Sequence, residues 1–214
     1  MFKLNNKIFE KRREIFLNKL DGKAAIIPAS SLVKHHADCE YPFRQDSNFW
    51  YLTGFDEPDA IALFLSHKPK GERFILFVSP KDVVGEVWYG FRWGIEGAEK
   101  EFKADKAHSI DDIKDLLPIY LEGSDEIVFS IGKHQRIEKA VLEIFTQQLE
   151  NRSRIGTGAN SIQPPESYLN EMRLIKSEFE INRMREAIQI SAEAHELVRA
   201  VSYTHLTLPT ICSV

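Results

Sequence analysis

The sequence predicts an α/β fold in which a mixed sheet of about five or six strands is covered by helices. Short apolar runs of strand length alternate with longer segments whose apolar residues recur at intervals of three and four. The clearest runs are residues 61–65 and 74–78, which a charged turn at residues 67–73 separates. Strands joined by so short a turn pair antiparallel, so at least part of the sheet is expected to be antiparallel.

The first elements follow from simple patterns. A helix is expected at residues 6–20, where apolar residues follow helical spacing and the basic residues 11–13 form a solvated face. Gly22 suits the left-handed conformation that ends a helix. Residues 24–27 are typical of a buried strand, and Pro28 is expected to end it.

An aromatic-rich stretch lies near the middle of the predicted sheet. Residues 49–52 place four large side chains in a row, and a turn containing Gly54 and Pro58 separates them from the next apolar run. This arrangement indicates a pair of buried elements. Just upstream, His35 and His36 are typical of an exposed polar turn, because adjacent side chains diverge and rarely bind one ion.

The remaining elements are predicted from caps, breakers and periodicity. Residues 151–165 are rich in Gly and Pro towards their end, which predicts a linker. Ser177 and Glu180 form a capping box, and the helix that follows carries an apolar stripe that needs a partner. Another helix is expected to begin at the N-cap residues 109–112 and to run to Leu117, with Pro118 as its stop. Further helices are expected at residues 95–102, 136–149 and 166–175, and a further strand at residues 126–129.

Composition narrows the possible functions. The 214 residues, 43% hydrophobic and 28% charged, have room for one full domain and part of another. A net charge of -4 gives no electrostatic reason to expect nucleic acid or a membrane surface as partner, and no apolar run approaches a membrane span. The N-terminus lacks a secretory pattern, and Cys39 and Cys212 form neither metal spacing nor a disulfide framework. A cytoplasmic protein is therefore expected.

Two places could contact a ligand. Residues 86–94 alternate aromatic side chains with Gly and Arg, which fits a strand end with Trp88 or Tyr89 packed inward. A surface for stacking nucleic-acid bases is the other general interpretation, but the acidic net charge counts against it. An exposed Trp on a loop could also anchor an apolar ring of a ligand. Asp38, taken alone, is typical of a cap or turn residue.

Three stretches together resemble the N-terminal domain of aminopeptidase P, the Xaa-Pro aminopeptidase. They are YPFRQDSNFWYLTGFDEP at 41–58, EVWYGFR at 86–92 and RLIKSEFEI at 173–181. The resemblance runs from the first helix to about Ala200. It implies the mixed α/β domain of the aminopeptidase P and creatinase type at residues 1–160, then a linker and the first helix of a truncated pita-bread catalytic domain at 161–200.

The resemblance also implies a function. The chain would be the N-terminal fragment of a hydrolase, a metallopeptidase that removes an N-terminal residue preceding proline. The family's two metal ions, usually manganese, are bound by residues downstream of the last helix, so no catalytic or metal-binding residue is expected here and the chain itself should be inactive. Asp38 matches a family Asp that faces the substrate cleft. Trp88 matches a Trp that projects into the active-site mouth of a neighbouring subunit, which implies a homo-oligomer and peptides with proline second as partners.

The C-terminal residues depart from the pattern of the preceding helix, and two alternative functions remain open. Residues 201–214 break the helical pattern with Thr and Pro209, resemble a translated sequencing adapter, and are expected to be a non-native tail. One alternative is a stand-alone binding or scaffolding module of the same fold. The other is a prolidase or creatinase relative, since that two-domain plan serves several substrates. The stretches at 41–58 and 86–92 favour aminopeptidase P, and the unpartnered helix disfavours a stand-alone module.

Overall fold

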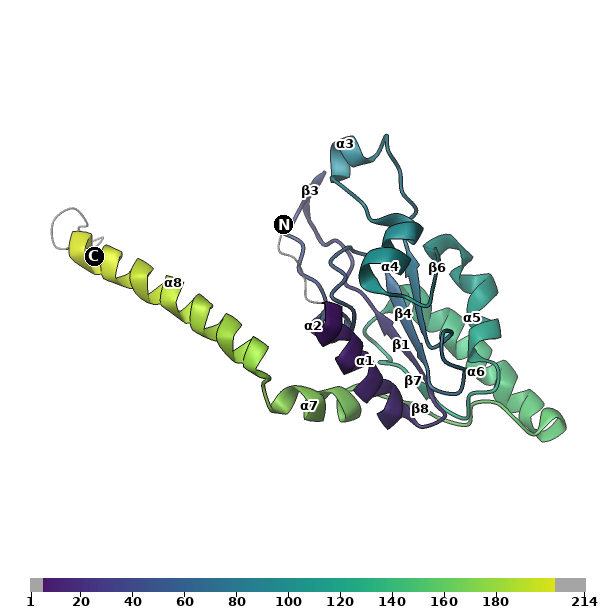
Figure 1. Cartoon of the computed structure of the whole chain (residues 1–214). Coiled ribbons are helices and arrows are strands. Elements are labelled where there is room, and N and C mark those ends of the chain that lie inside the picture. The colour runs from purple at the N-terminus through teal and green to yellow at the C-terminus, as the bar shows by residue number, and fades with distance from the viewer. Residues whose placement is uncertain (1–5, 203–214) are drawn as a thin grey trace, which may run out of the picture. The chain divides into compact units, whose positions relative to one another are not determined.

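Five strands of the central sheet run in one direction and β4 runs against them. The computed structural model describes residues 6–202 and orders these strands β6-β5-β4-β1-β7-β8 (Figure 1). The mixed sheet of six strands and the antiparallel β4–β5 pair are both as the sequence predicts. The strands are β1 (Ala24–Pro28), β4 (Ile61–Leu65), β5 (Phe74–Val78), β6 (Lys106–Ser109), β7 (Ile127–Val128) and β8 (Ile162–Gln163).

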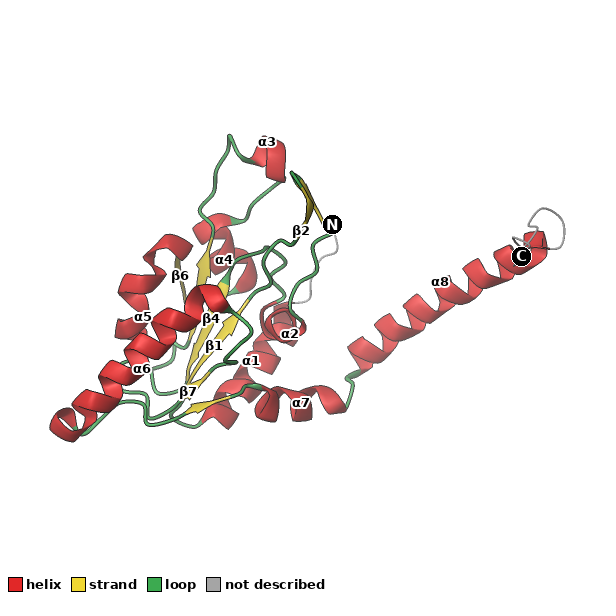
Figure 2. Cartoon of the chain, turned by 180° about the vertical axis from the view of Figure 1, so that it is seen from behind, coloured by secondary structure: helices red, strands yellow, loops and turns green. Residues whose placement is uncertain are grey.

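Helices cover both faces of the sheet, as Figures 1 and 2 show from opposite sides. On one face, the Phe16 ring of α1 packs edge-on against Phe64 of β4 at 5.3 Å. On the other, Leu117 and Val141 join the strand residue Leu63 in one buried cluster. The helices of the first face are α1 (Asn6–Leu20), α2 (Ser47–Thr53) and α4 (Gly94–Phe102), and those of the second are α5 (Ile113–Leu121) and α6 (Gln135–Ile155).

Two arginines of α1 correct the sequence prediction. Residues 11–13 were expected to face solvent, but Arg12 and Arg13 are only 6% and 5% exposed. Arg12 Nη1 donates to the Tyr51 carbonyl at 3.2 Å, and Arg13 Nη1 donates to the Leu52 carbonyl at 3.2 Å. Carbonyls at a helix C-terminus lack intrahelical donors and carry partial negative charge, so buried guanidinium groups suit them. The arginines thus tie α1 to the end of α2.

Other predictions are wrong at the level of single elements. Pro118 does not end its helix but lies inside α5, which continues to Leu121. The predicted linker at 151–165 instead completes α6 and supplies the edge strand β8, which pairs in parallel with β7. By contrast, β1 does end at Pro28 as predicted, and Pro28 is itself the last paired residue, opposite Ile61. Around His35 and His36 the exposed turn is part of a small ribbon, β2 (Lys34–His36) with β3 (Cys39–Glu40).

The chain divides into two compact units, whose described parts are residues 6–169 and 170–202. Helix α7 (Glu166–Leu174) spans the division, and α8 (Glu178–Ser202) makes up most of the second unit. The predicted capping box begins α8: Ser177 N–H donates to Glu180 Oε2 at 2.9 Å, and Glu180 N–H donates to Ser177 Oγ at 3.4 Å. Helix α8 continues through Ser202, and the rest of the predicted tail lies outside the described residues.

Most of the large apolar side chains of α8 are exposed, and Phe179 and Ile181 are half-buried. Met184, Ile188 and Leu197 are among the exposed ones, while the pairs that stabilise the helix, such as Arg199 with Glu196 at 2.8 Å, lie within one turn. Surface pairs of this kind contribute only a few tenths of a kcal/mol. Helix α8 thus has the unpartnered apolar stripe that the sequence predicts. None of the helices in the described part of the chain is long and apolar enough to cross a membrane.

Candidate functional site

Both residues predicted to contact substrate lie on loops at one edge of the sheet. Strands β1 and β5 point the same way, because each pairs antiparallel with β4. The segments that follow them therefore leave from the same edge, the carboxyl edge, where open α/β sheets commonly bind ligands. One segment carries Asp38 in the β2–β3 ribbon, and the other carries Trp88 in α3 (Glu86–Tyr89). Figures 1 and 2 both draw the ribbon and α3 at this end.

Trp88 lies on a short helix and not at the strand end that the sequence suggests. Its side chain is 84% exposed, so it is not packed inward. Tyr89 N–H and Gly90 N–H donate to the carbonyls of Gly85 and Glu86 at 3.0 Å, which closes a single helical turn. Because exposed apolar rings contribute little to folding, the Trp88 ring is available to a partner or ligand.

The sequence builds this turn with two glycines. A Cβ on Gly85 would lie 2.4 Å from Asp82 Oδ2, so a larger residue there would displace the Asp82 carboxylate. Gly90 ends the turn at a φ of 78°, which glycine adopts without strain. Asp82 also accepts a hydrogen bond from Val84 N–H at 3.1 Å.

The two ends of the segment that carries Trp88 are packed against the fold, whereas its tip is exposed. We call residues 81–94 the Trp88 loop. At its ends, a Cβ on Gly94 would come within 3.0 Å of Lys81 Cβ. The ring of Trp93 packs edge-on against Phe102 of α4 at 5.3 Å. Trp93 N–H donates to Glu57 Oε1 at 2.6 Å, which joins the loop base to the turn before β4.

Asp38 lies in the exposed turn between β2 and β3. We call residues 29–46, which contain this ribbon, the Asp38 loop. Ala37 has a φ of 45°, a conformation seldom taken by a residue with a side chain, and it turns the chain immediately before Asp38. The ring of His35 packs edge-on against Tyr41 at 4.6 Å across the ribbon. The Asp38 carboxylate is therefore presented on the surface, with the Cys39 thiol 3.9 Å away.

Glu57, which the sequence marks only as part of the stretch at 41–58, is the most deeply buried carboxylate near these loops. Its side chain is only 5% exposed, and its Oε2 has no hydrogen-bond partner among the described residues. Burial raises the pKa of Glu57, an effect that the bond from Trp93 N–H and the charge of Arg92 oppose. A Glu before Pro in a turn is usually exposed, so no sequence pattern signals this burial.

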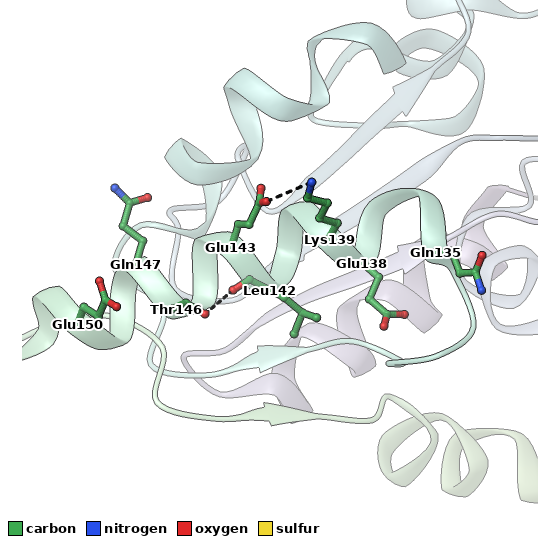
Figure 3. A pocket seen from close by; sticks show the side chains of 8 residues that line it. All are labelled: Gln135, Glu138, Lys139, Leu142, Glu143, Thr146, Gln147 and Glu150. Atoms are coloured by element: carbon green, nitrogen blue, oxygen red, sulfur yellow. Dashed lines mark hydrogen bonds and ion pairs between the residues drawn. The ribbon is translucent and has the colours of Figure 1, made fainter.

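A separate cleft of about 700 Å³ opens at the same edge, between the end of β1 and the start of α6. Its charged side chains are largely paired: Arg136 bonds Asp59 at 2.9 Å, and Lys133 bonds Glu166. Neither Asp38 nor Trp88 lines it. Figure 3 shows a shallower hollow whose eight lining residues, 135 to 150, all belong to α6, so it is a helix surface and not a cleft.

The described residues do not form a metal centre. Among residues 6–202, no three His, Cys, Asp or Glu side chains are grouped so that they could hold a metal ion. A hard divalent cation needs several clustered oxygen ligands, and the donors around Asp38 do not supply them. No step of a metal-dependent reaction can therefore be assigned to these residues.

Comparison with known proteins gives one consistent result. A family described as "Aminopeptidase P, N-terminal domain" matches residues 9–129. The Xaa-Pro aminopeptidase of Haemophilus influenzae is 37% identical over 196 residues, which are 91% of this chain and 43% of that protein. The Xaa-Pro aminopeptidase of Escherichia coli is 32% identical over 201 residues, 91% of this chain and 44% of that protein. The solved structure of Pseudomonas aeruginosa aminopeptidase PepP has a TM-score of 0.84 at 31% identity, over 94% of this chain and 45% of its own. The chain thus spans a little under half the length of these relatives.

Proposed function

The chain belongs to the aminopeptidase P family, and on that basis we propose that it forms the N-terminal part of an Xaa-Pro aminopeptidase. The complete enzyme would hydrolyse the bond between an N-terminal residue and a following proline. The observation that carries the proposal is the 32–37% identity to two proteins of that name over 91% of the chain. The prolidase and creatinase alternatives find no such support in these names.

In this proposal the two loops at the carboxyl edge contact the peptide. The exposed ring of Trp88 offers an apolar face that suits proline, and it would reach the site of a neighbouring copy in a homo-oligomer. The Asp38 carboxylate would attract the positively charged amino terminus of the peptide. Divalent metal, which we propose to be manganese, would activate the attacking water in the part of the enzyme that its relatives carry beyond this chain.

The proposal includes the domain plan and the compartment. We place the boundary of the N-terminal domain near residue 169 and not near 160, because β8 pairs with β7 and the compact units divide at 169. Residues 170–202 would then begin the catalytic domain, which would cover the apolar stripe of α8. A cytoplasmic enzyme remains our proposal from the cysteine pattern.

A chimera tests this function. Residues 1–200 of this chain are joined to the part of the Haemophilus influenzae relative that lies beyond the matched region. With manganese, the chimera should release the first residue of a tripeptide with proline second, while the 214-residue chain and the relative's C-terminal part alone should not. A folded chimera that cleaves tripeptides with alanine second equally well would contradict the proposal. Peptide binding by the 214-residue chain without turnover by the chimera would support a stand-alone binding module.

A further inference from the structure

Glu57 makes hydrogen bonds to the bases of both loops. Its side-chain Oε1 accepts from Trp93 N–H at 2.6 Å, at the base of the Trp88 loop. Its backbone carbonyl accepts from Gln45 Nε2 at 2.8 Å, at the base of the Asp38 loop. One residue of the turn at 54–58 is therefore bonded to two segments that reach the same edge of the sheet.

Gln45 extends this link across the whole base of the Asp38 loop. Its Oε1 accepts from Ser30 N–H at 2.8 Å and from Asp46 N–H at 2.9 Å. These two backbone donors lie near the start and at the end of the Asp38 loop, so Gln45 holds the loop ends together. Gln45 Nε2 also donates to the Phe55 carbonyl at 3.2 Å, which adds a second bond to the turn.

The turn that carries Glu57 is itself well fixed. Gly54 ends α2 in the left-handed conformation, with its N–H donating to the Trp50 carbonyl at 2.8 Å. Phe55 is fully buried and packs edge-on against Phe102 at 4.8 Å. Because Trp93 packs on the same Phe102 ring, the turn and the base of the Trp88 loop share one apolar support.

We propose that Glu57 is a positioning residue, which fixes the Trp88 loop relative to the Asp38 loop and so sets where the Trp88 side chain meets substrate. The part of this proposal that concerns substrate rests on the proposed function. The part that concerns the loops does not, because it follows from the two bonds of Glu57. Glu57 does not itself touch substrate, since its side chain is buried.

A purely structural role would give a different pattern. A buried carboxylate with one unpartnered oxygen is costly, and an apolar residue of similar size could fill the space without that cost. If the role were purely structural, replacing Glu57 would change the global stability and would affect the Trp88 loop no more than the rest of the domain. A positioning role predicts, in addition to any change in global stability, a local effect on the segment whose backbone N–H loses its acceptor.

The first test uses the 214-residue chain and amide hydrogen exchange. Glu57→Met removes the acceptor at nearly constant length, and Glu57→Gln keeps a weaker, neutral acceptor. Exchange at the Trp93 amide should rise about tenfold in the Met variant and by less in the Gln variant, with faster exchange across residues 81–93. Asp105→Met is the matched control, because Asp105 accepts from Arg73 and Phe74 N–H at 2.8 and 2.9 Å at the opposite end of β5. It should leave residues 81–93 unchanged.

Unchanged Trp93 exchange in both Glu57 variants, or a uniform rise across the sheet, would overturn the positioning role. If the Met variant does not fold, the Gln variant decides alone, because an amide oxygen accepts more weakly than a carboxylate. A few-fold rise at Trp93 would support the role, and an unchanged rate would contradict it.

The second test is a double-mutant cycle in the chimera described above. Glu57→Met should raise KM about tenfold with little change in kcat, and Glu57→Gln should restore most of the loss. In a Trp88→Ala background, Glu57→Met should add little, because the group that it positions is absent. Fully additive effects would refute the positioning role. If Trp88→Ala alone has no kinetic effect, the proposed function of Trp88 fails, while the exchange test of Glu57 stands.

Discussion

Strand β5 and the Trp88 loop follow one another in the chain, and both are rich in large apolar side chains. Every residue of β5 is at most 3% exposed, from Phe74 to Val78. In the loop, Val83, Val84 and Trp88 are 72%, 79% and 84% exposed. The same residue types therefore serve folding in the strand and remain free for contact in the loop. The difference lies in what covers these side chains. Helices cover both faces of the sheet that contains β5, whereas none of the described elements covers the tip of the Trp88 loop.

The largest expected effect comes from the strand. Phe77 is fully buried between the sheet and α5, so Phe77→Ala should cost about 3–5 kcal/mol of unfolding free energy. The matched loop variant, Val84→Ala, should change it by less than about 0.5 kcal/mol. Urea denaturation followed by far-ultraviolet circular dichroism measures both. Equal losses would mean that the loop tip is packed against the fold.

The buried arginine of α1 should come next. Arg13 bonds the carbonyls of Leu52 and Phe102, and its guanidinium lies 4.3 Å from the centre of the Phe74 ring. Burial lowers the pKa of Arg13 to about 10, because it disfavours the charged form. In Arg13→Met, however, the carbonyls of Leu52 and Phe102 would each lose a hydrogen-bond donor. The expected loss is about 1–3 kcal/mol of stability. Lys11→Met, at an exposed position of the same helix, is the control and should be nearly neutral.

Glu57 should give a smaller effect that depends on pH. Burial raises its folded-state pKa above the ordinary value of 4.5, so the folded state holds the proton more tightly than the unfolded chain. This stability is present below pH 4.5 and is lost as pH rises through the folded-state pKa. Arg92 opposes the shift, while Asp56 and Glu86 add to it. Relative to wild type, Glu57→Gln should therefore gain stability as the pH rises above 4.5.

Thermal unfolding of the two proteins over a series of pH values measures the difference. A constant difference at every pH would contradict a raised pKa for Glu57.

The smallest effect on stability is expected in α8. Ile188 is exposed, so Ile188→Ala should leave the unfolding midpoint of residues 6–169 unchanged. Amide exchange in residues 178–200 should also be fast compared with residues 74–78, because an isolated helix gains little from propensity alone. Equal protection of the two segments would mean that the stripe is covered, for example by a second copy.

The sequence predicts the elements that have a strong apolar period and misses those that do not. The helix at 6–20 and the strand at 74–78 have the predicted bounds, because their apolar residues repeat clearly. Strands β6 and β8 were missed since they are short, lie at the edges and contain polar residues. The prediction that Arg12 and Arg13 face solvent was wrong, because nothing in the local sequence shows that the carbonyl of Leu52 would accept a hydrogen bond from Arg13.

The candidate site shows the same limit. Family resemblance singled out Asp38 and Trp88, and the structure presents both on the surface. The link through Gln45 and Glu57 could not be predicted, because it depends on contacts between segments 36 residues apart, from Glu57 to Trp93. Burial of a turn carboxylate is decided by the tertiary structure and leaves no periodic signal.

The variant Trp88→Ala most directly tests the contrast between the buried side chains of β5 and the exposed side chains of the Trp88 loop. Its unfolding midpoint is measured in the 214-residue chain, and its kinetics on a tripeptide with proline second are measured in the chimera. The exposed ring predicts an unchanged midpoint together with a loss of about 1–3 kcal/mol in substrate binding, the size of a good aromatic contact with its buried area. A fall of about 3–5 kcal/mol in unfolding free energy with unchanged kinetics, as for a core Trp, would contradict it.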